Sequence, residues 1–475
     1  MLNKRSPSQT LKALLICSFS VIILFLGFFT NCWRVADQHW FDNHQRDMES
    51  FIIGRMVKSR QDSIFSSGGL TGQGSLDAAR VDHFDDPGSR QYAAQTNDFS
   101  TGAKQEIQYF AYTNGLPFGT YTTYNSQIGG QGMFFGILDK LTTVSPQEKL
   151  RFFHALTSLF SAITLAAIIL WFYLEFGLTV ALLVLASAVF SQWLVVFGRN
   201  LWWSMWSFYV PVAVVMHYLG FKREAMNIKP FTFGVMVFIT VFIKCLFTGY
   251  EYITTTLVMM IVPLVYYGVL KGWNFRKFLT GLFAAAFGSC LAILLTFVIL
   301  CFQVASVKGS FRDGVNQIVY CFAKRTYANP NDFPAEYTAS LESGTIRVVA
   351  RYLKGTFFDA NNYLSCSNKF VSLYLLKVHY LYLILLFMTM SGALYFLRNR
   401  YVSEEEKRKH LALIIATWFS ILAPLSWFII FKAHSYIHTH MNFIVWQMPF
   451  VFFGFAVCGL VVKSLLPNLI RRLRN

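Results

Sequence analysis

Charged residues are scarce in this chain of 475 residues: 14% are Asp, Glu, Lys or Arg, whereas 55% are hydrophobic. With 49 Phe residues and a mean hydropathy of +0.44, the composition excludes an ordinary soluble domain. Several uninterrupted apolar runs reach the ~20 residues that a helix needs to cross a bilayer. Because these runs are continuous rather than alternating, we expect membrane-spanning α-helices and not the strands of a barrel.

Motifs for nucleotide, redox or structural-metal chemistry are also missing. The eight Cys residues form no Cys-x-x-Cys pair, and the chain has no P-loop, nucleophile elbow, His-Glu-x-x-His or dinucleotide fingerprint in a suitable context. Cys321 and Cys366 fall in one expected external loop, where a disulfide between them stays an open alternative.

The net charge is +17, and its distribution predicts how the chain crosses the membrane. Lys and Arg cluster at the N-terminus, near 222–229, 271–277 and 398–409, and after residue 462, whereas the short turns on the other side hold few. This asymmetry places both termini in the cytoplasm. The charge is therefore a topology signal, and we expect no nucleic-acid partner.

These patterns predict an all-α, polytopic membrane protein with about ten transmembrane helices and two large periplasmic loops. The expected spans lie at about 11–31, 152–175, 178–197, 201–220, 231–250, 252–270, 279–305, 370–397, 411–431 and 442–466. They divide the chain into the N-terminus with the first span (1–32), a first external loop with an acidic surface helix (33–148), spans two to seven (149–305), a second external loop (306–369), and the last three spans with a basic tail (370–475). We see no internal repeat, which disfavours an inverted-repeat transporter.

The stretch directly after the first span carries the first candidates for chemistry. If 42–59 is one helix, Asp42, Arg46 and Glu49 share a face at i, i+4 and i+7, whereas Asp47 points elsewhere. An acid–Arg–acid stripe at the membrane surface suits a general base that is oriented by a cation. The alternative is a solvated helix with weak surface ion pairs. The position after the anchor favours the functional interpretation.

Further candidates lie at the expected ends of spans. Lys244 lies inside an apolar run with Glu251 on the same stripe, so it either snorkels to the interface or meets an anionic head group. The other candidates for binding phosphate or sugar are Arg199 in an outer turn, Arg347 and Arg351 in the second external loop, and Lys432, His434, His438 and His440 in the last external turn. The spacing of His434 and His438 is compatible with a metal, but no third ligand is obvious, so hydrogen bonds to the substrate are favoured.

This order of features resembles the GT-C superfamily of integral-membrane glycosyltransferases, and it is most similar to the bacterial O-antigen-modifying (serotype-converting) glucosyltransferases. The resemblance rests on the first span and the acidic loop after it (DNHQRDMESFIIGRMVKSRQDSIFSSGGLTG), on YNSQIGGQG before the second span, and on HSYIHTHMN before the last. It covers the architecture of the whole chain.

The resemblance implies an enzyme of the bacterial inner membrane that transfers a sugar, glucose in the closest branch, from polyprenyl phosphate to a glycan such as O-antigen. It also implies an acid of the first external loop as the base, and the candidates are Glu49, Asp47 and Asp42, in that order. The adjacent acids common in the superfamily are absent, and Asp47-x-Glu49 is the nearest form, which leaves the base and a divalent cation open. No other cofactor is implied.

Cations near the outer leaflet would stabilise the departing lipid phosphate, and the sequence offers Lys244, Arg199, Arg347 and Arg351 for this role. Two other functions stay open. A transporter or flippase for a lipid-linked glycan would need an ionisable path through the bilayer, and an O-antigen polymerase would need two lipid sites and an arginine-rich external loop.

Overall fold

The computed structural model describes residues 7–76, 101–221, 228–364, 368, 370–397 and 403–474. Among them, seven helices are long and apolar enough to cross a membrane, or eight if one bent pair is a single span. The seven are α1 (Pro7–Thr30), α8 (Pro146–Phe176), α12 (Pro230–Thr248), α13 (Ile253–Lys271), α14 (Phe275–Lys308), α18 (Tyr380–Leu397), and α19 (Glu404–Ser420) continued by α20 (Leu422–Ile430).

Each of the ten expected spans coincides with a helix, but three of these helices are not simple spans. The span expected at 178–197 consists of two helices, α9 (Leu178–Val189) and α10 (Gln192–Gly198), and the chain bends by 68° between them. Two others, α11 (Trp206–Phe221) and the apolar part of α22 (Phe450–Arg474), are shorter than the ~20 residues that a straight crossing needs. The structure therefore supports a polytopic helical protein and does not confirm the count of ten.

The first long loop folds onto the end of the bundle. Its elements are α2 (Gln38–Asn43), α3 (Arg46–Gln61), a 3₁₀ turn η2 (Ser66–Gly69), β1 (Gly72–Ser75), α6 (Thr101–Asn114), β2 (Thr120–Thr123) and α7 (Gly130–Leu141). β1 pairs antiparallel with β2, and α3 packs against α6, α7 and β1. The N-cap Asp37 starts α2 by accepting a hydrogen bond from the Trp40 N–H at 2.9 Å.

The second long loop contacts the first. It contains α15 (Phe311–Ala323), η3 (Pro330–Asp332), η4 (Ala335–Tyr337), α16 (Thr338–Leu341), α17 (Thr345–Leu353), β3 (Thr356–Asp359), η5 (Ala360–Asn362), a π-helical turn η6 (Val371–Leu375) and β4 (Lys377–His379). The Asn362 side chain donates to the Val35 carbonyl at 2.7 Å. η6 and β4 take up the start of the span expected at 370–397, so α18 begins ten residues later. Cys366 lies outside the described residues.

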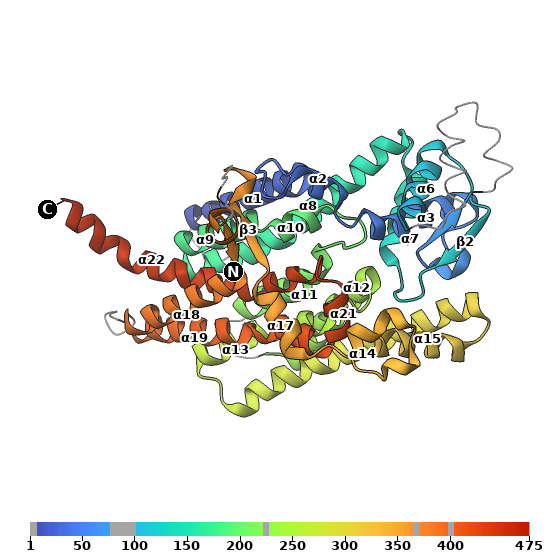
Figure 1. Ribbon diagram of the computed structural model, residues 1–475. Helices are drawn as coiled ribbons and strands as arrows, with labels where there is room; N and C mark the ends of the chain where they lie inside the picture. The colour runs from blue at the N-terminus through green and yellow to red at the C-terminus, as the bar shows by residue number, and fades with distance from the viewer. Residues whose placement is uncertain are drawn as a thin grey trace.

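The two ends of the molecule are built from different elements. At one end α3, α6, α7 and β2 lie together, with α15 beside them, while the C-terminus lies at the far end, beyond α9 (Figure 1). Between them α1 packs on α8, α12 on α14, and α9 on α22. The last turn before α22 adds α21 (Lys432–Ile437) and η8 (Asn442–Gln447). The first and second loops and this turn therefore meet at one end of the helical bundle.

Candidate functional site

Glu49, the first of the predicted bases, lies at a junction of four elements. From the first turn of α3, its Oε1 accepts hydrogen bonds from the Tyr109 hydroxyl of α6 at 3.0 Å and from His154 Nε2 of α8 at 2.8 Å. Its Oε2 accepts from the Leu201 N–H at 3.0 Å, in the turn between α10 and α11. Because a carboxylate only accepts, His154 carries its proton on Nε2. The Glu49 side chain is 5% exposed and holds the loop to the bundle.

These contacts set the charge of Glu49. Burial by itself raises the pKa of the carboxyl, but the charge and hydrogen bond of His154, with the bonds from Leu201 and Tyr109, lower the pKa to about 2. A general base works best when its pKa lies near the operating pH. Glu49 is therefore ionised at neutral pH and anchors the loop, which makes it poorly suited to take a proton.

We expect this buried carboxylate to make the stability of the protein depend on pH. The folded pKa of Glu49 lies at about 2, below the unfolded value of 4.5, so its contribution is full above pH 4.5 and is lost as the pH falls towards 2. The contribution amounts to about 3 kcal/mol. Unfolding of the wild type and of Glu49→Gln, followed by thermal scans from pH 6 to pH 2.5, should show a wild-type advantage that shrinks with acidification. A difference that stays constant over this range would contradict the assignment.

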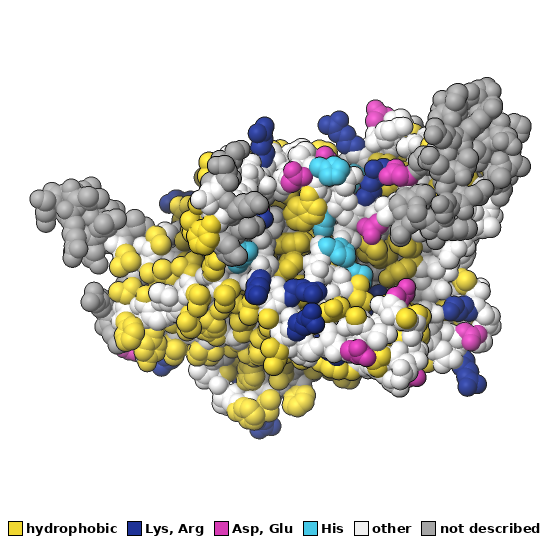
Figure 2. Space-filling model, in the orientation of Figure 1, with side chains coloured by type: hydrophobic (Ala, Val, Ile, Leu, Met, Phe, Trp, Pro, Cys, Tyr) yellow, Lys and Arg dark blue, Asp and Glu magenta, His cyan; other side chains and the backbone are white. Residues whose placement is uncertain are grey.

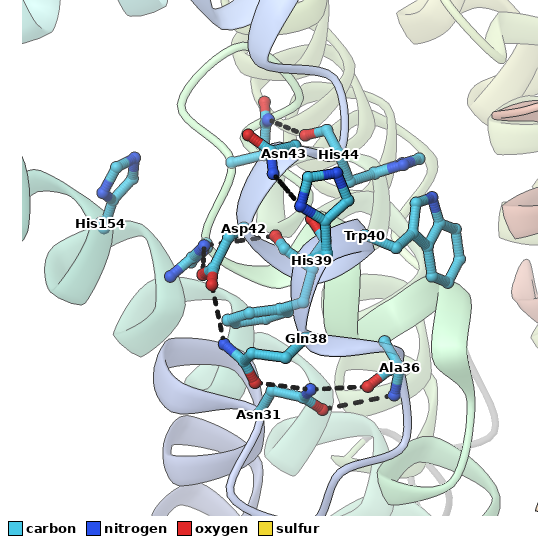
Figure 3. Close-up of polar contacts among 12 residues, drawn as sticks. Asn31, Ala36, Gln38, His39, Trp40, Asp42, Asn43, His44 and His154 are labelled. Carbon is cyan, nitrogen blue, oxygen red and sulfur yellow. Dashed lines mark hydrogen bonds and ion pairs between the residues drawn. The ribbon is translucent and has the colours of Figure 1, made fainter. Parts of the chain in front are cut away.

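Asp42, Arg46 and Arg199 line one cavity of about 210 Å³ together with Glu49. Asp42 Oδ1 lies 2.8 Å from Arg199 Nη2, and Asp42 Oδ2 accepts from Gln38 at 3.0 Å. Figure 3 shows Asp42 turned towards Gln38, with His154 on the neighbouring helix. Three predicted site residues and the first-ranked base therefore do come together. Each charged side chain that lines this cavity has a partner among the described residues: Asp42 pairs with Arg199 and Glu49 with His154. Arg46 in turn binds Glu106 at 3.1 Å.

The prediction that Asp42, Arg46 and Glu49 share one face of a single helix is wrong. The helix expected at 42–59 is interrupted, because Gln45 adopts a left-handed conformation (φ 55°) between α2 and α3. Asp42 therefore belongs to a different helix from Arg46 and Glu49. The Asn200 side chain stabilises the break by donating to the His44 carbonyl at 3.3 Å.

A second cluster, which we call the His–Arg cluster, consists of Asp47, Glu251, Arg325, His434, His438 and His440. Glu251 Oε1 lies 3.3 Å from Arg325 Nη1, and Glu251 Oε2 lies 3.7 Å from His434 Nε2. The His434 and His438 rings lie 4.5 Å apart, and the His438 and His440 rings 5.5 Å apart. Several His side chains gather near the middle of one face, with basic and acidic side chains around them (Figure 2).

Burial keeps these histidines neutral. Burial, and then the Arg325 charge, lower the pKa of His434 well below its usual value, and burial with His434 lowers the pKa of His438 to about 2. Burial also lowers the pKa of His440, whereas the Asp47 carboxylate near it acts in the opposite direction. Glu251 raises the pKa of Arg325 against the effect of burial. The cluster thus offers one fixed cation and neutral imidazoles that can donate or accept hydrogen bonds.

Asp47 differs from the other two predicted acids. It is half-buried in the first turn of α3, and its carboxylate makes no hydrogen bond or ion pair with any residue that the structure describes. Since successive helical residues are about 100° apart, Asp47 and Glu49 project from different sides of α3. Asp47 therefore belongs with the His–Arg cluster, whereas Glu49 belongs with the cavity on the other side of the same turn.

The other predicted cations have different surroundings. Lys244 neither snorkels nor faces lipid: it is fully buried, and its Nζ donates to the Gly249 and Glu251 carbonyls at 2.7 and 2.5 Å. Lys432 Nζ likewise donates to the Leu341 and Ser343 carbonyls at 2.7 and 2.9 Å. Both ammonium groups hold backbone turns in place and are unavailable to a substrate.

The two arginines of α17 stay at the surface. Arg351 Nη1 donates to the Tyr436 carbonyl at 3.1 Å, next to the cluster, while Arg347 is exposed. Arg199, in contrast, pairs with Asp42 in the cavity beside Glu49.

Sequence reasoning missed Arg325, Tyr124 and His154. Arg325 Nη2 donates to the Tyr124 hydroxyl at 3.2 Å, which joins the second loop to the first. The signal available for Arg325 was the Lys324-Arg325 pair at the end of an amphipathic helix. Nothing local marks His154, which lies in an ordinary apolar span.

Among the described residues, no three His, Cys, Asp or Glu side chains are arranged to hold one metal ion. The pair His434 and His438 therefore lacks the further ligand that a metal site requires. No family model matches the chain, and no curated protein or solved structure matches it either.

Proposed function

We propose that the chain is a membrane-embedded glycosyltransferase of the GT-C type, which takes a sugar from a polyprenyl-phosphate donor and transfers it to a glycan hydroxyl. The observation that carries this proposal is Asp47. It is the one of the three predicted acids that makes no described ion pair, and its charge raises the pKa of His440, which places its electrostatic influence within the His–Arg cluster. The proposal moves the role of base from Glu49 to Asp47.

In this reaction Asp47 takes the proton of the acceptor hydroxyl as its oxygen attacks the anomeric carbon. The bond between that carbon and the phosphate oxygen breaks, and the lipid phosphate leaves with one more negative charge. Arg325, fixed by Glu251 and Tyr124, and the neutral imidazoles of His438 and His440 supply donors for that charge. No nucleotide is consumed, which agrees with the lack of a nucleotide motif.

The lipid-linked substrate also accounts for where the cluster lies. A polyprenyl phosphate keeps its charged group at the membrane interface, and the cluster is built from loops at one end of the bundle. On the topology that the positive-inside rule predicts, this end faces the periplasm of a bacterial inner membrane.

A transporter or flippase is less well supported. Its path would need ionisable groups at membrane depth, such as Lys244, Glu175 and a few histidines, and the two charged candidates already have partners among the described residues. Lys244 binds two backbone carbonyls, and Glu175 accepts hydrogen bonds from Tyr266 and Tyr267 at 3.1 and 2.9 Å. For a polymerase, the arginines of α17 would have to build a second lipid site, and Arg351 already binds the Tyr436 carbonyl.

Purified protein mixed with a polyprenyl-phosphate hexose and a lipid-linked glycan acceptor should release free polyprenyl phosphate and form a longer glycan. Without the acceptor, slow release of hexose by water is the expected partial reaction. Heat-inactivated protein is the control, and mass spectrometry of the lipids is the readout. In sealed vesicles, movement of the intact donor across the bilayer with no change in its bonds would establish a transporter and refute the enzyme.

A further inference from the structure

The helix α17 has an exposed face that is basic over much of its width. At 100° per residue, Arg347, Arg351 and Lys354 lie within one arc of about 60°. All three are exposed, and none of them forms an ion pair with a residue that the structure describes. Of the acids nearest in the sequence, Glu342 is exposed and Asp359 is paired with another lysine. The face therefore keeps an excess of positive charge.

The same face carries a prominent apolar side chain. Ile346 is 86% exposed, more than any other large hydrophobic side chain that the structure describes. It lies next to Ala350 on the helix surface and about 80° from Lys354. The opposite face is buried through Val348 and Tyr352. An exposed apolar side chain beside cations is the pattern of a surface that meets lipid head groups and the upper parts of acyl chains.

Contacts attach α17 to the ends of two membrane helices. The Tyr352 ring stacks on Phe428 of α20, with the ring centroids 4.0 Å apart. Just past α17, the Gly355 carbonyl accepts a hydrogen bond from the N–H of Tyr380, the first residue of α18, at 3.0 Å. Both membrane helices expose apolar side chains near these contacts, namely Ile429 and Ile430 on α20 and Leu381 and Tyr382 on α18.

The exposed face of α17 therefore lies where the lipid-facing surface of the bundle ends. Figures 1 and 2 share one orientation, and Lys and Arg side chains gather where α17 runs, beside a broad hydrophobic surface. This is the depth at which a bilayer presents its phosphates to a protein.

We propose that the exposed face of α17 docks on anionic phospholipids of the adjoining leaflet, which is the outer leaflet on the topology that the positive-inside rule predicts. Arg347 and Lys354 bind lipid phosphates, and Ile346 lies among the first carbons of the acyl chains. The guanidinium of Arg351, which the Tyr436 ring and carbonyl hold in place, adds its charge to the attraction.

The charge of the face decides which lipid fits. A zwitterionic head group would bring its own cation towards these side chains, so a lipid with a net negative charge, such as phosphatidylglycerol, is preferred. A soluble phosphate would leave Ile346 in water. The surface does not depend on the proposed sugar transfer, because it needs no donor and no acceptor.

Quenching by brominated lipids measures which head groups lie against this face. A fluorescent amino acid is incorporated at position 350, in the middle of the exposed face. The full-length protein is placed in nanodiscs of phosphatidylglycerol and phosphatidylcholine, with one or the other lipid brominated. We expect stronger quenching by phosphatidylglycerol. Arg347→Gln and Lys354→Gln should each lower this preference about fivefold, the usual contribution of one cation near a lipid surface.

Two further variants separate charge from apolar contact. Arg276→Gln removes an exposed cation at the start of α14, away from α17, and should leave the preference unchanged. Ile346→Ser should weaken the quenching by both lipids alike, because it removes the apolar contact and no charge. Raising the salt concentration should lower the preference in the wild type.

The outcomes separate the alternatives. Equal quenching by the two lipids, or a preference that neither cation variant lowers, overturns the choice of an anionic head group. The absence of quenching by either lipid overturns the docking. If added glycerol phosphate removes the quenching by phosphatidylglycerol, the face binds soluble phosphate. If a trace of polyprenyl phosphate removes it, the face binds the lipid of the sugar donor. Either displacement overturns the phospholipid.

Discussion

Replacing Asp47 with Asn should reduce the rate of sugar transfer by about 10²–10⁴-fold, the usual contribution of a general base. The amide keeps the size of the side chain but cannot take the proton of the acceptor hydroxyl. Because Asp47 makes no hydrogen bond or ion pair with the described residues, the protein should fold with an unchanged unfolding temperature. Initial rates with a polyprenyl-phosphate hexose should show the loss in kcat, with KM for the donor little altered.

Two matched variants of the same segment serve as controls. Asp42→Asn removes a half-exposed partner of Arg199 and should cost less than about tenfold in rate, since such surface pairs contribute little. Glu49→Gln should lower the unfolding temperature together with the rate, because three donors lose the buried carboxylate that they share. If Asp47→Asn stays fully active while Glu49→Gln loses activity without loss of stability, Glu49 is the base and our reassignment is wrong.

Continuous apolar runs explain why the membrane helices could be predicted from the sequence. A continuous apolar run specifies a helix by itself in a membrane, where every backbone group must bond within its own segment. The ends were less predictable. α18 starts at Tyr380 because Lys377–His379 pairs with Thr356–Asp359, and that pairing joins segments from two sides of the second loop.

The residue types of the candidate site could be predicted from the sequence, but their arrangement in space could not. The acids after the anchor and the histidines of the last turn are visible in the sequence, and in the structure the charge of Asp47 acts on His440. The break at Gln45 is a tertiary effect, since Asn200 binds the interrupted backbone from a distant turn. Arg325 joins the cluster through Glu251 and Tyr124, whose sequence positions carry no sign of the contact.

Trp202, Trp203 and Trp206, which follow Arg199 in the sequence, also show that a local pattern does not reveal tertiary contacts. Their spacing after a turn fits an aromatic belt at the membrane surface. In the structure Trp202 is buried against Phe51 and Tyr124, and Trp203 against Tyr252. Trp202 thus joins the first loop to the bundle, whereas Trp203 packs within the bundle, and no local sequence pattern distinguishes either position from a belt.

Arg55→Met should be the most destabilising single change on α3. The Arg55 side chain is fully buried, and its guanidinium donates to the carbonyls of Ser66, Ser63 and Ile64 at 2.5, 2.7 and 2.9 Å. Met fills a similar volume without any donor, so these carbonyls lose the guanidinium that joins them. Hydrogen bonds from a charged donor contribute about 1.5–3 kcal/mol each, and because water reaches part of this turn we expect a total loss of about 3–5 kcal/mol.

This loss should propagate beyond α3. The turn that Arg55 holds includes Gly68, whose carbonyl accepts a hydrogen bond from the Gln303 side chain of α14 at 2.9 Å. Gly68 has a positive φ of +66°, and a Cβ atom at this position would lie 2.6 Å from the Gln303 carbonyl oxygen, so only glycine fits. The turn therefore connects the first loop to a long membrane helix. Proteolysis of Arg55→Met should show faster cleavage within 63–70, together with a lower unfolding temperature.

Arg46→Met on the same helix is the matched control. Arg46 binds Glu106 in an ion pair whose side chains are 36% and 41% exposed, so its loss should cost no more than about 1 kcal/mol. Thermal unfolding of the two variants should thus differ by several degrees, in favour of Arg46→Met. Equal unfolding temperatures would show that the guanidinium of Arg55 does not hold the turn, and that the packing of α3 on α6 and α7 alone fixes the loop.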